Sequence, residues 1–118
     1  MLPKENRITK KKEFDGFFGR DFKVNGGYSV SSNNFVIKTK LVKSGSNRIG
    51  FIINTKVDKR ATVRNRVKRQ VREIFFNNLK QFNRKVDVLV VIQPAAKNLT
   101  FKQIEDDVVG MLRKIRLI

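Results

Sequence analysis

The amino-acid sequence predicts a small α+β domain: helices packed on one mixed β-sheet, in the order α-β-β-β-α-β-α. Two observations predict this class. Residues 61–80 and 100–115 repeat apolar side chains at the three- and four-residue spacing of a helix, whereas 35–42 alternate and 87–92 are continuously apolar. The 118 residues are the length of one domain, and their 40% apolar fraction is sufficient for a core.

The chain is expected to begin with an extended arm over residues 1–9. Residues 10–18 follow as a short helix, because Phe14, Phe17 and Phe18 lie at helical spacing. A glycine pair then marks a break before the first strand.

Four segments are predicted as strands. Residues 28–30 and 35–42 come first, followed by a turn at 44–47 and a return strand at 48–53. The strands on either side of that turn are expected to pair antiparallel. Residues 87–92 lack alternation, which predicts a strand covered on both faces.

Two longer helices complete the fold. The first covers 61–80, with Thr62 as its expected N-cap. The second begins with a capping box between Thr100 and Gln103. The apolar stripes expected to face the core are Val63, Val67, Val71, Ile74 and Phe75 in the first helix and Ile104, Val108, Met111, Leu112 and Ile115 in the second.

The charge of the chain predicts a polyanionic partner. The formal net charge is +17, and the sequence pI is about 10.9. The segment from Lys56 to Arg72 contains eight Lys or Arg residues and a single acid, Asp58. Charge of one sign at this density repels itself, and the guanidinium fork suits phosphate, so the exposed side of the long helix is predicted to bind nucleic acid.

A second basic segment precedes the first helix. Three lysines, 10–12, stand before Phe14, Phe17 and Phe18. Basic residues interleaved with aromatic rings form platforms on which unpaired bases stack. The alternative is that all three rings pack into the core, and the sequence does not decide between the two.

The composition excludes several classes of function. With no Cys and no His, the chain lacks thiolate and imidazole chemistry, and we expect no bound metal. Glu105, Asp106 and Asp107 are consecutive on one helix, so they should point in different directions and act at the helix start, not as a catalytic cluster. No apolar signal or membrane-length segment is present, which predicts a cytoplasmic protein without membrane contact.

The order and spacing of one set of residues resembles a known family. The set is Arg48-x-Gly50-Phe51, Lys56, Arg64-Asn65-Arg66-Val67-Lys68-Arg69 and Arg72-Glu73. It is similar to the signature of the bacterial ribonuclease P protein subunit. The segments Arg7-Ile8-x-Lys10-Lys11 with Phe14 and Phe18, Asp87 to Pro94, and Leu99-Thr100-Phe101 also resemble that family.

The resemblance implies a function. Ribonuclease P removes the 5′ leader of precursor tRNA, its RNA subunit carries out the hydrolysis with Mg²⁺, and the protein assists without an active site of its own. The expected partners are that catalytic RNA and precursor tRNA, not DNA. The family also implies a left-handed crossover around the basic helix. The residues expected to contact the catalytic RNA are Lys56, Arg64, Asn65, Arg66, Lys68, Arg69 and Arg72, and those expected to contact the leader are Lys11, Phe14, Phe18, Phe35 and Lys38.

Two departures and two rival functions accompany this hypothesis. Lys38 stands where relatives frequently carry an aromatic residue, so one leader contact is expected to be ionic. The loop 57–61 lacks the Gly of many relatives. On residue chemistry alone, a structural ribosomal RNA-binding protein or a protein-only nuclease are the alternatives.

Overall fold

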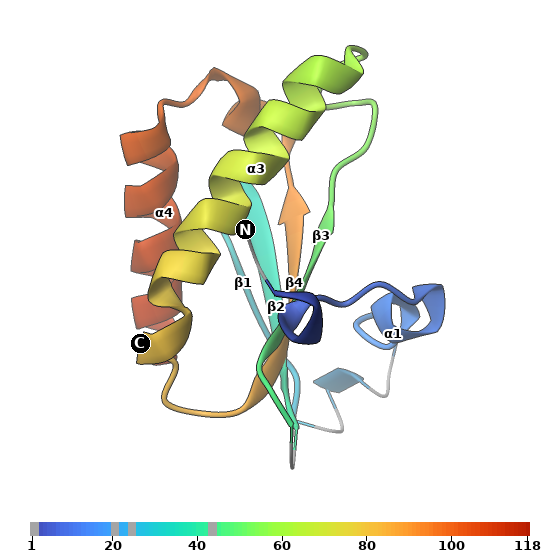
Figure 1. The fold of residues 1–118 in the computed structure, drawn as a ribbon, viewed down its shortest axis with the longest axis vertical. Helices are drawn as coiled ribbons and strands as arrows, with labels where there is room; N and C mark the ends of the chain where they lie inside the picture. Colours follow the sequence, from blue (N-terminus) through green and yellow to red (C-terminus); the bar gives the residue numbers. More distant parts are fainter. Residues whose placement is uncertain (1–2, 20–21, 24–25, 43–44) are drawn as a thin grey trace.

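The computed structural model describes residues 3–19, 22–23, 26–42 and 45–118. The predicted order of elements is confirmed (Figure 1). Its main elements are α1 (Lys11–Asp15), β1 (Tyr28–Ser31), β2 (Phe35–Leu41), β3 (Arg48–Ile52), α3 (Ala61–Asn78), β4 (Val86–Ile92) and α4 (Phe101–Lys114). Short 3₁₀ segments are η1 (Lys4–Asn6), η2 (Leu79–Gln81) and η3 (Pro94–Asn98).

The four strands form one mixed sheet in the order β1-β2-β4-β3. Strand β4 runs antiparallel to β2 and parallel to β3. The predicted antiparallel pairing of 35–42 with 48–53 is therefore wrong, because β4 lies between β2 and β3. The turn composition at 44–47 is a local signal, whereas the insertion of the most apolar strand at the centre is decided by burial of both its faces.

The connection from β3 through α3 to β4 has the uncommon hand. Figure 1 shows α3 in front of the sheet: the chain rises along β3, descends through α3 and rises again along β4, which lies to the left of β3. This path is a left-handed crossover, whereas almost all such connections are right-handed. The handedness agrees with what the family resemblance implies.

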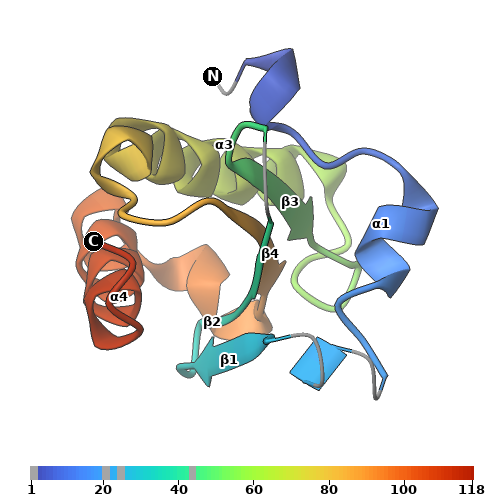
Figure 2. The same ribbon diagram turned by 90° about the horizontal axis from the view of Figure 1, so that it is seen from below.

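Strand β4 is buried on both faces, as predicted. Helices α3 and α4 cover one face of the sheet and α1 covers the other (Figure 2). Toward α3 and α4, Val88 and Val90 join the main core. Toward α1, Leu89 packs with Ile8 and Phe17 in a smaller core. Phe17 is fully buried, so one ring of the aromatic segment does belong to the core.

The two long helices begin in different ways. The capping box of α4 is confirmed: the Gln103 N–H donates to the Thr100 hydroxyl at 3.2 Å, and the Thr100 N–H donates to the Gln103 side chain at 2.9 Å. The expected Thr62 cap of α3 is wrong, because the N-cap residue is Arg60 and it makes no side-chain cap. Instead, the carboxylate of Asp58 accepts the Arg60 N–H at 2.8 Å.

The N-terminal segment is docked and only partly extended. Lys4–Asn6 form the 3₁₀ turn η1, and the Asn6 side chain donates a hydrogen bond to the Asn47 carbonyl at 2.7 Å. Arg7 then forms a parallel bridge with Ile49, so the arm borders the free edge of β3. Helix α1 is shorter than the predicted 10–18, since it ends at Asp15 and Gly16 is its C-cap residue. Residues 1–2 of the predicted arm and residue 44 of the predicted turn lie outside the described residues.

One ion cluster joins three elements. The Arg48 guanidinium on β3 donates to both carboxylate oxygens of Asp87 on β4, at 3.1 and 2.8 Å. It also forms a salt bridge with Glu13 on α1. Asp87 is buried, and its hydrogen bond raises the pKa of Arg48 above its ordinary value. Because this pairing satisfies a buried carboxylate, it fixes β3 against β4 and brings α1 to the same place.

Replacing Arg48 with an apolar side chain tests this cluster. Arg48→Met leaves the buried Asp87 carboxylate without its partner, so the free energy of unfolding should fall by about 1–3 kcal/mol in urea denaturation, with the partial exposure of Arg48 limiting the loss. Lys102→Met, which removes an exposed cation paired with Glu105 and Asp106, is the matched control. Equal stability of the two variants would contradict the proposed role.

Candidate nucleic-acid interface

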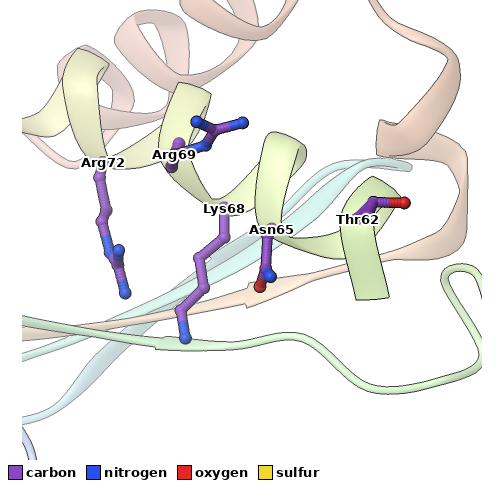
Figure 3. Close-up of a pocket in the computed structure, with 5 residues that line it drawn as sticks. All are labelled: Thr62, Asn65, Lys68, Arg69 and Arg72. Atoms are coloured by element: carbon purple, nitrogen blue, oxygen red, sulfur yellow. The ribbon is translucent and has the colours of Figure 1, made fainter. Parts of the chain in front are cut away.

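The exposed side of α3 carries a groove of about 460 Å³, which we call the α3 groove. Residues spaced three, four and seven positions apart share one side of a helix, and this spacing brings the polar side chains together. Figure 3 shows Asn65, Lys68 and Arg72 pointing to the same side of α3. The groove is lined by Thr62, Asn65, Lys68, Arg69 and Arg72.

Like charges are crowded in the α3 groove. Burial lowers the pKa of the Lys68 ammonium, and the neighbouring charge of Arg72 lowers it further. The Arg72 guanidinium lies 5.9 Å from the centre of the Phe51 ring, which fixes its direction. No ion pair joins Lys68, Arg69 or Arg72 to a carboxylate among the described residues. An anion in the groove would therefore relieve a repulsion between cations that no ion-paired carboxylate of the described residues offsets.

Two of the predicted RNA contacts also hold the protein together. Arg64 donates to the backbone carbonyls of Asp58 and Lys59, at 2.8 and 2.9 Å. Arg66 donates to the carbonyl of Lys97 at 2.9 Å. These bonds tie α3 to the loop before it and to η3, while Arg66 stays exposed. Arg64 and Arg66 therefore flank the α3 groove and do not line it.

Lys56 lies beside a second basic cavity, at the loop before α3. The cavity measures about 450 Å³. Asp58 is the acid of this loop, and it pairs with Arg60 at 3.1 Å and Lys97 at 3.4 Å. The hydrogen bonds from Arg60 hold the pKa of Asp58 well below its ordinary value. The expected RNA contacts did not include Lys59, Arg60 or Lys97, although the first two belong to the basic segment noted between Lys56 and Arg72.

Four of the five predicted leader contacts gather around α1. We call Lys11, Phe14, Phe18 and Lys38 the α1 cluster. The Phe18 ring is 48% exposed, and the Lys38 ammonium lies 4.5 Å from its centre. Lys38 also donates to the carbonyl of Phe17 at 3.3 Å. An exposed ring held beside an ammonium group offers one stacking surface and one positive charge.

Phe35, the fifth predicted leader contact, does not belong to this surface. Its side chain is fully buried and belongs to the main core, on the α3 and α4 side of the sheet. Lys38 is an odd number of residues away on the same strand, and successive side chains point to opposite faces. The prediction for Phe35 is wrong for that reason.

Phe14 connects the α1 cluster to the α3 groove. Its ring is packed so closely on Gly50 that a Cβ atom there would stand 2.6 Å from a ring carbon. The other side of Phe14 lines a groove of about 260 Å³, which we call the arm groove. The arm groove is lined by Arg7, Ile8, Thr9, Phe14, Ile49, Phe51, Lys68 and Arg72. The expected RNA contacts did not include Arg7 and Thr9, although their alternation with the apolar Ile8 is typical of an edge strand.

The acidic cluster of α4 is dispersed, as predicted, but none of its three acids lies in the first turn of the helix. Asp107 accepts hydrogen bonds from Ser32 at 2.7 Å and Asn34 at 3.0 Å. Glu105 and Asp106 both pair with Lys102 instead. Within the described ranges, no three acidic side chains gather as a metal site. No helix in that part of the chain has the length and apolarity needed to cross a membrane.

Comparison with known proteins decides the family. A family model described as Ribonuclease P matches residues 2–116. The chain belongs to the ribonuclease P protein family. It is 29% identical to the ribonuclease P protein component of Pseudanabaena sp. over 100% of this chain and 97% of that protein. It is 31% identical to the component of Dictyoglomus turgidum over 100% of this chain and 95% of that protein.

Solved ribonuclease P proteins share the fold described above. The structure of the Staphylococcus aureus protein aligns with a TM-score of 0.81 at 28% identity, covering 97% of this chain and 98% of that one. The Thermotoga maritima protein aligns with a TM-score of 0.69 at 26% identity, covering 82% of this chain and 93% of that one. This member of the family is accordingly a subunit of an RNA-containing endoribonuclease, and the ribosomal alternative has no support.

Gly50→Ala tests whether the sheet sets the position of Phe14. The added methyl group would overlap the Phe14 ring, so α1 should lift from the sheet and its backbone amides should exchange faster with solvent. Hydrogen exchange measures this directly. The exposed Gly110, which has open space at its Cβ position, gives the control substitution Gly110→Ala. Unchanged exchange in α1 would show that the ring is not held by this contact.

Proposed function

We propose that this protein binds the catalytic RNA of ribonuclease P through the α3 groove and its flanking residues. We further propose that it binds the 5′ leader of precursor tRNA through the α1 cluster and so assists endonucleolytic removal of the leader. The observation that carries the proposal is the α3 groove, where Lys68, Arg69 and Arg72 lie without ion-paired carboxylates in a chain of this family. The remaining predicted contacts on this side are Lys56, Arg64, Asn65 and Arg66.

The α3 groove would act by neutralising phosphates. Folded RNA brings phosphates close together, and their repulsion opposes compaction at moderate salt. Cations displayed on a rigid helix supply compensating charge without a large loss of side-chain entropy at Arg72, which is already held over Phe51. The protein should therefore help the catalytic RNA most when salt and magnesium are low.

The α1 cluster would distinguish substrate from product. A precursor tRNA carries unpaired leader nucleotides, whereas the mature tRNA does not. Contacts of the leader with the ring of Phe18 and the ammonium groups of Lys11 and Lys38 would strengthen binding of the precursor alone. The product then dissociates, because it lacks the segment that these residues hold.

The chemistry in this proposal belongs to the RNA subunit. Mg²⁺ would be bound and used by that RNA, and the protein contributes binding and positioning in the cytoplasm. The test is to measure cleavage of precursor tRNA at low magnesium with the protein alone, with the catalytic RNA alone and with both together. The proposal requires strong cleavage only in the mixture. Cleavage by the protein alone would establish a protein-only nuclease instead.

Arg69→Gln tests the α3 groove. Arg69 is exposed and makes no hydrogen bond or ion pair within the described residues, so its loss should leave stability unchanged. Affinity for the catalytic RNA should fall about five- to tenfold at 0.1 M salt, and the slope of log K against log salt should decrease by about 0.7–0.9. Titration of the RNA at several salt concentrations measures both quantities. Binding equal to that of the Lys102→Gln control would remove Arg69 from the interface.

Phe18→Ala tests the α1 cluster. Loss of a stacking surface worth about 1–3 kcal/mol should weaken binding of precursor tRNA to the assembled enzyme at least fivefold, with mature tRNA unaffected. Equilibrium binding of both RNAs gives the comparison. Phe101, 38% exposed at the start of α4, provides the control Phe101→Ala. An equal loss for precursor and mature tRNA would mean that Phe18 has no role in leader recognition.

A further inference from the structure

Six basic residues gather where α3 and α4 both end. In Figure 1 the ends of these helices and the turn into β4 meet near the C-terminus, far from the start of α3, and Figure 2 views this end of the molecule. All six side chains are exposed. We call them the basic pole: Lys80, Arg84, Lys85, Arg113, Lys114 and Arg116.

The two segments of the basic pole are fixed to each other. The Asn83 N–H donates to the Leu117 carbonyl at 2.9 Å, and its side chain donates to the Arg116 carbonyl at 2.8 Å. The Arg84 guanidinium donates to the Ile115 carbonyl at 2.9 Å and so closes the end of α4. These bonds fix the backbone that carries the other five cations, and the Arg84 side chain takes part in fixing it.

The cations of the basic pole are not ion-paired with acids among the described residues. Glu105 and Asp106 line the same cavity as Arg113, but both pair with Lys102. Cations that share one end of the molecule repel each other, and binding of a polyanion there would relieve this repulsion.

The backbone of Arg116 adds an independent observation. Its φ is +59°, the left-handed conformation, and it is the only non-glycine residue with positive φ among those described. The Leu117 N–H donates to the Leu112 carbonyl at 3.0 Å, the bond that closes a helix end of the type where glycine is preferred. An arginine here is less favourable for folding than glycine. The left-handed backbone therefore places an exposed charge where glycine would be more stable.

We propose that the basic pole is a second surface for RNA phosphates, separate from the α3 groove and the α1 cluster. The ligand is a phosphate backbone, because residues 80–85 and 113–117 carry exposed cations and no exposed aromatic ring, and Phe82 packs against the core. The exposed Phe76 belongs to the preceding turn of α3. The inference rests on the proposed function, since it requires the protein to work while bound to RNA. The phosphates belong either to the catalytic RNA or to precursor tRNA, and binding to each RNA distinguishes the two.

A fourfold charge-neutralised variant tests the basic pole. It combines Lys80→Gln, Lys85→Gln, Arg113→Gln and Lys114→Gln and leaves Arg84 in place to hold the fold. Titration with catalytic RNA, and of precursor tRNA with the assembled complex, should show a loss of at least tenfold in one arm at 0.1 M salt. The salt slope in that arm should fall by about 0.7–0.9 for each lost contact. Unchanged affinity and slope in both arms would overturn the proposal.

Two single variants make the outcome specific. Lys102→Gln removes a cation that acids already balance, so it should change neither RNA affinity. Arg69→Gln tests the α3 groove in the same titrations. If Arg69→Gln weakens binding while the pole variant does not, the basic pole fails and the proposed function stands. If neither variant has an effect, both fail.

Arg116→Gly separates folding from binding at the pole. Glycine removes the left-handed strain, so the thermal unfolding midpoint should rise, while loss of the charge should weaken RNA binding several-fold. A higher midpoint with unchanged RNA affinity would contradict a binding role for Arg116. A lower midpoint would show that its side chain serves the fold.

Discussion

The burial of β4 on both faces is the constraint on which the rest of the structure depends. Its alternate side chains belong to two separate cores, one beneath α3 and α4 and one beneath α1. A strand with two apolar faces buries the most apolar surface at the centre of a sheet. Because β4 takes that central place, β2 and β3 do not pair directly with each other. Asp87, at one end of the same strand, receives Arg48 from β3, and Arg48 in turn reaches Glu13 of α1. One strand thus sets the positions of both candidate RNA surfaces.

A net charge of +17 is compatible with this fold because the charges and the core are separated along each element. On α3, Val67, Val71 and Ile74 are buried, while Asn65 and Arg69 are exposed. Acidic residues form local contacts; Asp58, for example, bonds to Arg60 and Lys97 and so stabilises the loop before α3. The result is a surface on which several groups of cations have no carboxylate partner among the described residues. Such a surface costs stability in the free protein and favours association with a folded RNA.

The sequence predicts those features of the fold and site that depend on local periodicity. The stripes of α3 and α4, the Thr100 capping box and the exposed basic face follow from spacing along one helix. Strand order does not follow, because pairing partners compete across the whole chain. Alternation places Phe35 and Lys38 on opposite faces but does not say which face each helix covers. The carbonyl contacts of Arg64 and Arg66 depend on loops that carry no periodic signal, and the left-handed crossover was available only from resemblance.

The central claim is that the α3 groove lies against the catalytic RNA. Because the chain has no cysteine, Thr62→Cys introduces a single attachment point in the groove for an iron chelate that cleaves nearby RNA. Lys102→Cys places the same chelate near the start of α4 as a reference. The account predicts localised cleavage of the catalytic RNA from position 62 and little from position 102. Equal or absent cleavage from position 62 in the assembled complex would contradict it.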